Sequence, residues 1–260
     1  MSNDYLQVCL IQSHLFWENP AANREQFSKK IAVVSEQVDL VVLPEMFSTG
    51  FSMQAKKLAE SMAGETVNWL VYQAKAHQIA LTGSLIIQED NQFFNRLFFV
   101  FPDGTFQTYD KRHTFTLAGE DRVYKAGSEK LLVDYKGWKI CPLICYDLRF
   151  PVFARNTEDY DLLLYVANWP KLRIDAWDTL LKARAIENMS YCIGVNRVGL
   201  DGNGYEYSGH SAAFDALGRK ISIQNKETEW MDVVSLRKEH IITNRNKLGF
   251  LRDRDRFSLL

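Results

Sequence analysis

Short apolar segments recur along this chain, and they constrain its fold more than any other feature. Seven of them are rich in Val, Ile, Leu or aromatic residues and have the length of buried β-strands. They span residues 6–11, 40–43, 79–87, 97–101, 139–145, 162–167 and 191–198. None approaches the roughly 18 residues that a membrane-spanning helix needs, so we expect no contact with a bilayer.

Helical patterns separate several of these segments, at residues 23–37, 65–77 and 175–189. Their expected buried faces carry Phe27, Ile31 and Val34; Trp69, Tyr72 and Ala76; and Trp177, Leu180, Leu181 and Ile186. Turn sequences at 101–104, 134–137 and 215–218 predict hairpins. Together these patterns predict an α/β fold of mixed sheets flanked by helices. Since no linker or repeat interrupts the chain, we expect one domain over residues 1–260, with 238–260 as a C-terminal tail.

Charge and cysteine usage exclude several classes of protein. The 31 Lys and Arg residues nearly cancel the 32 Asp and Glu residues, giving a net charge of −1. A protein that binds nucleic acid would normally carry a basic excess, so we expect none as a partner. The first 20 residues lack the features of a signal peptide, and the four cysteines are dispersed rather than arranged as a disulfide framework. We therefore expect a cytoplasmic protein.

Cys145 ends the apolar run 139–145, and polar residues follow it at once. Pro151 can begin a helix there, because its fixed φ suits the first helical position. A thiol on a strand-to-helix turn stands beside backbone N–H groups, as in a nucleophile elbow, and a helix N-terminus can lower the pKa of such a thiol. Taken alone, however, a buried structural thiol is the usual state of a cysteine in this context.

Two more ionisable residues follow strand-like segments. Glu45 comes just after the run 40–43 and a proline, and Lys111 comes just after the segment 105–109. Each of them alone is typical of a solvated loop. The ends of strands in α/β sheets nevertheless gather at one edge, where sites form. A thiol nucleophile, a carboxylate base and a cation beside the oxyanion would make a chemically complete set.

These residues lie in three segments, 43–47 (LPEMF), 109–113 (YDKRH) and 145–151 (CYDLRFP), which resemble the marker motifs of the nitrilase superfamily of carbon-nitrogen hydrolases, in the same order. Segments 168–170 (NWP), 183–188 (ARAIEN) and 194–199 (GVNRVG) add to the resemblance, which runs from about residue 5 to about residue 234. Tyr146 is typical of the amidase branch, whereas nitrile-cleaving members tend to have Trp followed by Glu. Within that branch the chain is most similar to omega-amidases.

The resemblance implies an α-β-β-α sandwich that pairs as a homodimer and needs neither a metal nor an organic cofactor. It implies that Cys145 is the nucleophile, Glu45 the general base and Lys111 the stabiliser of the tetrahedral intermediate. It also implies that Glu120 is a second glutamate that orients Lys111 or the substrate. Because Glu45 and Lys111 are polar groups at strand ends, we expect both to matter more for chemistry than for folding.

The implied reaction is hydrolysis of the terminal amide of a small dicarboxylate monoamide, such as 2-oxoglutaramate, through a cysteine thioester. Tyr146, Trp169 and Arg173 are the predicted substrate-binding residues, and Arg173 would hold the remote carboxylate. A solvated surface position is the alternative for Arg173. The alternative functions are hydrolysis of an N-carbamoyl compound or a nitrile, and non-catalytic binding of a small amide.

Arg149 and Asp147 also follow the predicted nucleophile closely. We expect them to form a structural ion pair beneath the turn, and contact with substrate is the alternative.

Overall fold

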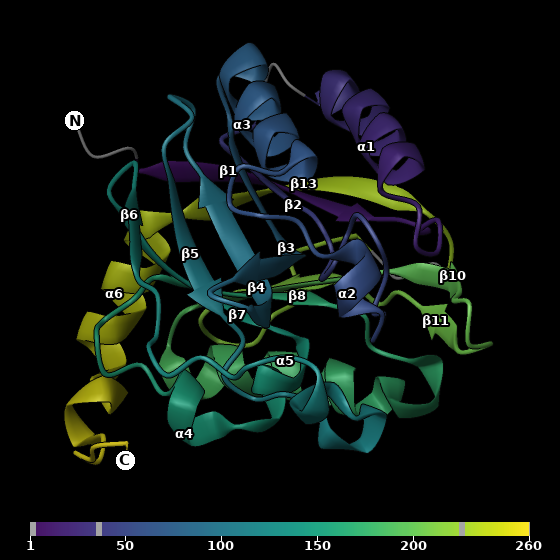
Figure 1. Cartoon of the computed structure of the whole chain (residues 1–260). Helices are drawn as coiled ribbons and strands as arrows, with labels where there is room; N and C mark the ends of the chain where they lie inside the picture. Colours follow the sequence, from purple (N-terminus) through teal and green to yellow (C-terminus); the bar gives the residue numbers. More distant parts are fainter. Residues whose placement is uncertain (1–3, 35–37, 224–226, 260) are drawn as a thin grey trace.

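The computed structural model of the chain describes residues 4–34, 38–223 and 227–259. Within these residues, two β-sheets form the centre of the molecule (Figure 1). The first has the order β13-β1-β2-β3-β4-β5, with β1 (Tyr5–Gln12), β2 (Leu40–Val42), β3 (Ala80–Glu89), β4 (Gln92–Val100), β5 (Phe106–Asp110) and β13 (Trp230–Arg237). The second has the order β12-β9-β8-β7-β6, with β6 (Val133–Tyr135), β7 (Trp138–Ile144), β8 (Leu162–Ala167), β9 (Tyr191–Asn196) and β12 (Ala212–Phe214). The short strands β10 (Val198–Leu200) and β11 (Glu206–Ser208) pair with each other.

Helices cover both outer faces of this pair of sheets. The helices α1 (Pro20–Val34) and α3 (Glu65–His77) lie on one side in Figure 1, and α4 (Pro151–Ala154) and α5 (Ile174–Asn188) lie on the other. A short helix, α2 (Ala55–Leu58), follows β2, and α6 (Lys238–Leu248) follows β13. This arrangement confirms the predicted α-β-β-α sandwich.

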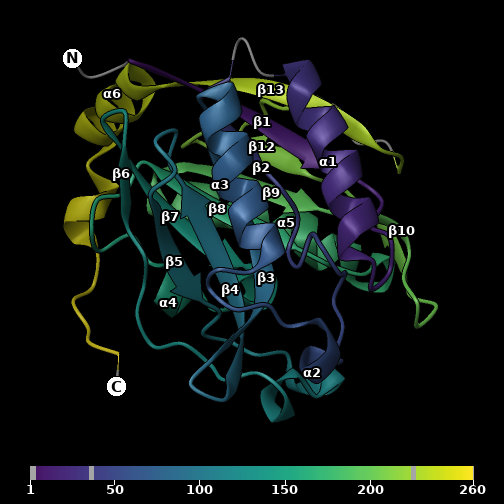
Figure 2. The same cartoon turned by 45° about the horizontal axis from the view of Figure 1, so that its top comes forward.

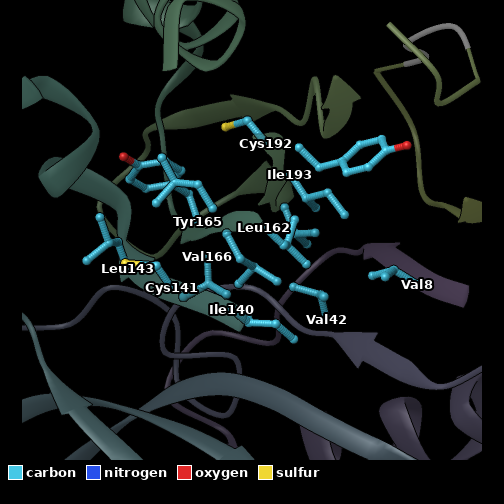
Figure 3. Close-up of a cluster of buried hydrophobic side chains, with 14 of the residues drawn as sticks. Val8, Val42, Ile140, Cys141, Leu143, Leu162, Tyr165, Val166, Cys192 and Ile193 are labelled. Carbon is cyan, nitrogen blue, oxygen red and sulfur yellow. The ribbon is translucent and has the colours of Figure 1, made fainter. Parts of the chain in front are cut away.

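The alternation of side chains along β1 explains why the layers stack in this way. Leu6, Val8 and Leu10 belong to the apolar cluster between the two sheets, while Cys9 and Ile11 belong to the cluster beneath α1 and α3. Successive side chains of a strand point to opposite faces, so a strand buried on both faces must be apolar at every position. Figure 3 shows part of the first cluster, with Val8 and Val42 of one sheet near Ile140 and Leu162 of the other, and with Cys141 and Cys192 on the far face of the second sheet.

Some sequence predictions of local structure were wrong. Helix α3 buries Val67, Leu70 and Ala74, whereas Tyr72 of the predicted face is 66% exposed. Both sets of residues have helical spacing, and the apolar pattern alone could not separate them. Strand β4 begins at Gln92 rather than at residue 97, because the predicted run excluded the polar pair 95–96. Strand β13 was not predicted, and residues 35–37 of the first predicted helix lie outside the described residues.

The topology brings the carboxyl ends of several strands to one edge of the molecule. Strand β2 runs parallel to β1 and β3, and two antiparallel steps make β5 parallel to β3 as well. In the second sheet, β7 runs parallel to β8. Residues that directly follow β2, β5, β7 and β8 are therefore placed to meet between the sheets.

The C-terminal segment packs against its own chain. Ile241 of α6 is buried in the cluster between the sheets, and the Arg245 guanidinium donates hydrogen bonds to the carbonyl oxygens of Met189 (2.8 Å) and Tyr160 (2.5 Å). Figures 1 and 2 place α6 at the end of the molecule away from β10 and β11. In the described part of the chain, no helix is both long and apolar enough to cross a bilayer.

Candidate active site

Three charged side chains meet between the sheets, away from solvent. The Lys111 ammonium lies 2.8 Å from Oε1 of Glu45, and 3.0 and 2.9 Å from the two carboxylate oxygens of Glu120. Glu45 and Glu120 are 0% exposed and Lys111 is 1% exposed. Lys111 directly follows β5 and Glu45 lies three residues after β2, as the strand-end argument predicted.

Neutral groups donate the remaining hydrogen bonds to both carboxylates. The Asn95 amide nitrogen donates to Oε1 of Glu45 (2.8 Å) and to Oε1 of Glu120 (3.1 Å). The backbone N–H of Asn168, directly after β8, donates to Oε2 of Glu45 (2.8 Å), and the backbone N–H of Phe115 donates to Oε2 of Glu120 (2.6 Å). Sequence reasoning missed Asn95, although a polar residue within an otherwise apolar strand was a signal that could have found it.

Burial and charge oppose each other in this cluster. Burial alone would lower the pKa of the Lys111 ammonium, but the charges of Glu120 and Glu45 outweigh it, and the pKa is raised. Burial raises the pKa of Glu120, a shift that Lys111 opposes and the charge of Glu45 reinforces. Two carboxylates therefore share one ammonium, which stays protonated.

Cys145 stands on a strained turn at the end of β7. Its φ of 44° lies in the left-handed region, which non-glycine residues seldom adopt. A 3-10 helix over Cys145–Arg149 follows, and α4 then begins at Pro151, as the sequence predicted. The thiol is 8% exposed, and its sulfur lies 3.9 Å from the carbonyl oxygen of Asn168.

The protonation state of this thiol differs from the expectation of a lowered pKa. Burial raises the pKa of Cys145 well above its usual value, and the charge of Glu45 and a hydrogen bond with Glu45 raise it further, whereas Lys111 lowers it. Proximity to one short helical turn cannot offset these effects. Cys145 therefore rests as a thiol with a carboxylate beside it, an arrangement in which a thiol can pass its proton to a base.

Asp147 connects the cysteine turn to the segment after Lys111, and the expected ion pair with Arg149 is wrong. Its Oδ2 accepts hydrogen bonds from the Tyr109 hydroxyl (2.8 Å) and the N–H of Ile144 (3.0 Å). Its Oδ1 accepts the N–H of His113 (3.1 Å) and lies 2.7 Å from Nδ1 of the same residue. These partners satisfy the buried carboxylate, so Arg149 is left to lie against the Trp169 ring, with its guanidinium carbon 4.8 Å from the ring centroid.

A cavity of about 480 Å³ opens onto this cluster. Its walls include Cys145 and Lys111 and all three residues predicted to bind substrate, which are Tyr146, Trp169 and Arg173. The glycine-rich segment 199–204 contributes Asp201 and Asn203. The structure thus brings the predicted site residues to one cavity, with Glu45 and Glu120 buried directly behind Lys111.

The remaining thiols are of a different kind. Burial raises the pKa of Cys9 and of Cys141 to about 12, and burial also raises the pKa of Cys192. These three side chains are packed in the apolar clusters, and none lines the cavity. No group of three or more His, Cys, Asp or Glu side chains that could hold a metal ion occurs among the residues that the structure describes.

Comparisons with known proteins agree with this geometry. The sequence is 43% identical to omega-amidase YafV of Yersinia enterocolitica, over 98% of this chain and 99% of the relative. It is 31% identical to 2-oxoglutaramate amidase of Bacillus subtilis strain 168, over 85% and 86% of the two chains. A CN-hydrolase superfamily protein of Xanthomonas campestris, solved with an arsenic adduct in its active site, superposes with a TM-score of 0.96 at 43% identity, covering 98% of this chain and 99% of that one. The family model of the carbon-nitrogen hydrolases matches residues 7–241, and the chain belongs to this family.

Proposed function

We propose that this enzyme hydrolyses the terminal amide of small dicarboxylate monoamides, with 2-oxoglutaramate as the representative substrate, to the acid and ammonia. Support comes from relatives that are themselves an omega-amidase and a 2-oxoglutaramate amidase. The observation that carries the proposal for this chain is a pair of arginines on the wall of the cavity.

Arg149 and Arg173 both line the cavity, and neither forms a salt bridge within the described residues. Arg149 lies over the Trp169 ring, and Arg173 lies over the Phe115 ring with its guanidinium carbon 5.3 Å from the centroid. Stacking on aromatic faces orients a guanidinium and leaves its N–H groups free to bind a carboxylate in a bidentate manner. A substrate with an amide at one end and a carboxylate at the other fits this arrangement.

In the proposed mechanism, the Cys145 sulfur attacks the amide carbonyl while Glu45 takes the thiol proton. The oxyanion forms beside the Lys111 ammonium and the backbone N–H of Tyr146, a cation and a hydrogen-bond donor placed where the charge develops. The C–N bond then breaks, Glu45 returns its proton to the departing ammonia, and a thioester remains on Cys145. Glu45 next takes a proton from water, which attacks the thioester. The C–S bond breaks, and Glu45 returns that proton to the sulfur, which releases the acid and restores the thiol.

Glu120 is proposed to remain ionised throughout this cycle. When Glu45 accepts the thiol proton it loses its charge, and the ammonium of Lys111 becomes available to the oxyanion. The bonds from Lys111 to both oxygens of Glu120 hold the ammonium in place during that change. The negative charge that Glu45 loses reappears on the oxyanion, so the total charge around Lys111 stays constant during the attack.

The first prediction tests the arginine pair. The Arg149→Ala and Arg173→Ala variants should each lose about 1.5–3 kcal/mol of transition-state binding for 2-oxoglutaramate, the magnitude of a hydrogen bond to a charged group. Ammonia release should be measured as kcat/KM with 2-oxoglutaramate and with a neutral amide of similar length. The neutral amide should be affected little, because it has no carboxylate.

Arg122 is an exposed arginine outside the cavity and gives a matched control, Arg122→Ala. Equal losses on both substrates would remove the two arginines from carboxylate binding. A wild-type enzyme that preferred neutral amides to 2-oxoglutaramate would overturn the proposed substrate class.

We also propose that the enzyme is a homodimer. Several large apolar side chains near the C-terminus are exposed in the single chain, including Phe250 (58%), Phe257 (43%) and Leu259 (45%). Such side chains would be shielded from water by a second copy. Light scattering at micromolar concentration should report twice the chain mass of 30.1 kDa, and a mass of one chain would contradict this proposal.

The cytoplasm is the proposed location. All four cysteines, Cys9, Cys141, Cys145 and Cys192, are free thiols. Disulfides persist mainly in oxidising compartments and are rare in the cytosol, so an enzyme with a reactive thiol suits a reducing compartment.

A further inference from the structure

Asn95 occupies a central position in the buried cluster that the reaction does not use directly. It lies in β4 and is 1% exposed, and its amide nitrogen donates to Glu45 and Glu120 at once. An ionised carboxylate only accepts hydrogen bonds, so the nitrogen of the amide, not its oxygen, must face both acids. The two N–H groups of one side chain thus connect the two carboxylates that share Lys111.

The charges of the cluster explain why a neutral donor is needed there. Two buried carboxylates face a single ammonium, and the bonds of Lys111 go to Oε1 of Glu45 and to both oxygens of Glu120. A second cation would compete with Lys111 for the oxyanion, and a third acid would add repulsion. An amide stabilises both carboxylates by hydrogen bonding without changing the charge.

The other end of the Asn95 side chain argues against a purely structural role. Its Oδ1 is buried and has no hydrogen-bond partner among the described residues. A buried carbonyl without a partner is unfavourable for folding, because the hydrogen bonds that it makes to water in the unfolded chain are not replaced. An asparagine selected only for stability would be satisfied at both ends, as Asn156 is, whose amide nitrogen and oxygen both bond to the backbone of Tyr160.

We infer that Asn95 is a positioning residue, whose amide holds Glu45 and Glu120 on either side of Lys111 and keeps Glu45 ready to accept the Cys145 proton. The inference rests on the proposed role of Glu45 as the base, but not on the identity of the substrate. When Lys111 turns to the oxyanion, Asn95 and the Asn168 N–H still hold Glu45 in place, so the carboxyl stays aimed between the sulfur and the leaving nitrogen.

The experiment measures the rate at which iodoacetamide alkylates Cys145 as a function of pH, followed by mass spectrometry. The titratable groups that face Glu45 are Lys111, Glu120, Cys145 and Tyr124. The acid limb of the profile reports how readily the Cys145 sulfur loses its proton, to solvent or to the carboxylate beside it. In Asn95→Ala this limb should move upward by about one pH unit, the equivalent of losing one hydrogen bond to the carboxylate. The kcat for 2-oxoglutaramate should fall about tenfold at neutral pH, with KM changed less than about twofold.

Three variants make the result decisive. In a Glu45→Gln background, Asn95→Ala should move the limb no further, because the carboxylate that Asn95 holds is absent. Asn156→Ala, which removes an equally buried asparagine outside the cavity, should leave the limb in place even if the protein is less stable. Asn95→Ser keeps a single hydroxyl donor and should shift the limb by less than Asn95→Ala does. An unmoved limb in the Asn95 variants would overturn the inference, and so would a failure of both variants to fold while Asn156→Ala folds. A moved limb in an enzyme that does not hydrolyse 2-oxoglutaramate would support the inference and refute only the proposed substrate.

Discussion

Replacing Cys145 by alanine is expected to lower amide hydrolysis by about 10⁴-fold or more, the scale on which enzymes lose rate when their nucleophile is removed. No other thiol lines the cavity, so no neighbouring group can form the thioester. The protein should remain folded, because the change removes one sulfur atom beside an existing cavity. Ammonia release at saturating substrate measures the loss, and circular dichroism with thermal unfolding checks the fold.

Cys192→Ala is the matched control, since that thiol is buried in an apolar cluster and takes no part in the proposed chemistry. This variant should lose some stability and keep its kcat. Iodoacetamide should label Cys145 of the wild-type protein before Cys9, Cys141 or Cys192. Activity in Cys145→Ala within about a hundredfold of wild type would refute its role as the nucleophile.

The second large effect is expected for Lys111→Met, on both rate and stability. Loss of one donor to an oxyanion costs about 10²- to 10³-fold in kcat. The sequence placed Lys111 at an exposed strand end, where its loss would spare the fold, but the structure buries it with Glu45 and Glu120. Removing the ammonium leaves two buried carboxylates without a counter-charge, and unfolding free energy should fall by about 3–5 kcal/mol.

This loss of stability should depend on pH in a defined direction. Without Lys111, burial and the charge of Glu45 act unopposed on Glu120, and its pKa in the folded state rises further above its unfolded value of about 4.3. The variant is therefore least impaired below that pH, and its deficit grows as the pH rises through the raised pKa of Glu120. Denaturant midpoints of variant and wild type at pH 5 and pH 8 measure the difference.

The double variant Lys111→Met/Glu120→Gln separates the two roles of this lysine. It removes one of the two uncompensated charges, so it should regain part of the stability at pH 8 without regaining activity. If the single Lys111→Met variant had wild-type stability at both pH values, Lys111 would not be the counter-charge of two buried carboxylates.

The location of the predicted site could be read from the sequence because of strand topology. Glu45 and Lys111 come just after strand-like segments and Cys145 ends one, and parallel strands bring such positions to one edge. The order of the three motifs also predicted the family and its sandwich fold, both of which are confirmed. The catalytic roles assigned to these residues stay predictions until the variants are measured.

Other features of the site depend on contacts that a linear pattern does not contain. Asn95 lies within a strand rather than at its end, and its contact with Glu45 depends on the pairing of β4 with β3 and on the course of the chain after β2. The hydrogen bonds of the Asp147 carboxylate come from Tyr109 and His113, which belong to a different segment. These bonds leave Arg149 without an ion pair to Asp147, and its side chain faces the cavity. In the same way, the buried face of α3 is set by what lies beneath the helix.

The raised pKa of the Cys145 thiol has a consequence for the durability of the enzyme. Peroxides and most electrophiles react with the thiolate, and susceptibility to oxidation follows thiolate character and exposure. Cys145 is 8% exposed and protonated at rest, so both its exposure and its thiolate fraction are low. The carboxylate that would activate the sulfur for an amide thus also suppresses the free thiolate between turnovers. Burial of the thiol and its contact with Glu45 would then both limit oxidative damage, while the same contact keeps the proposed base beside the sulfur.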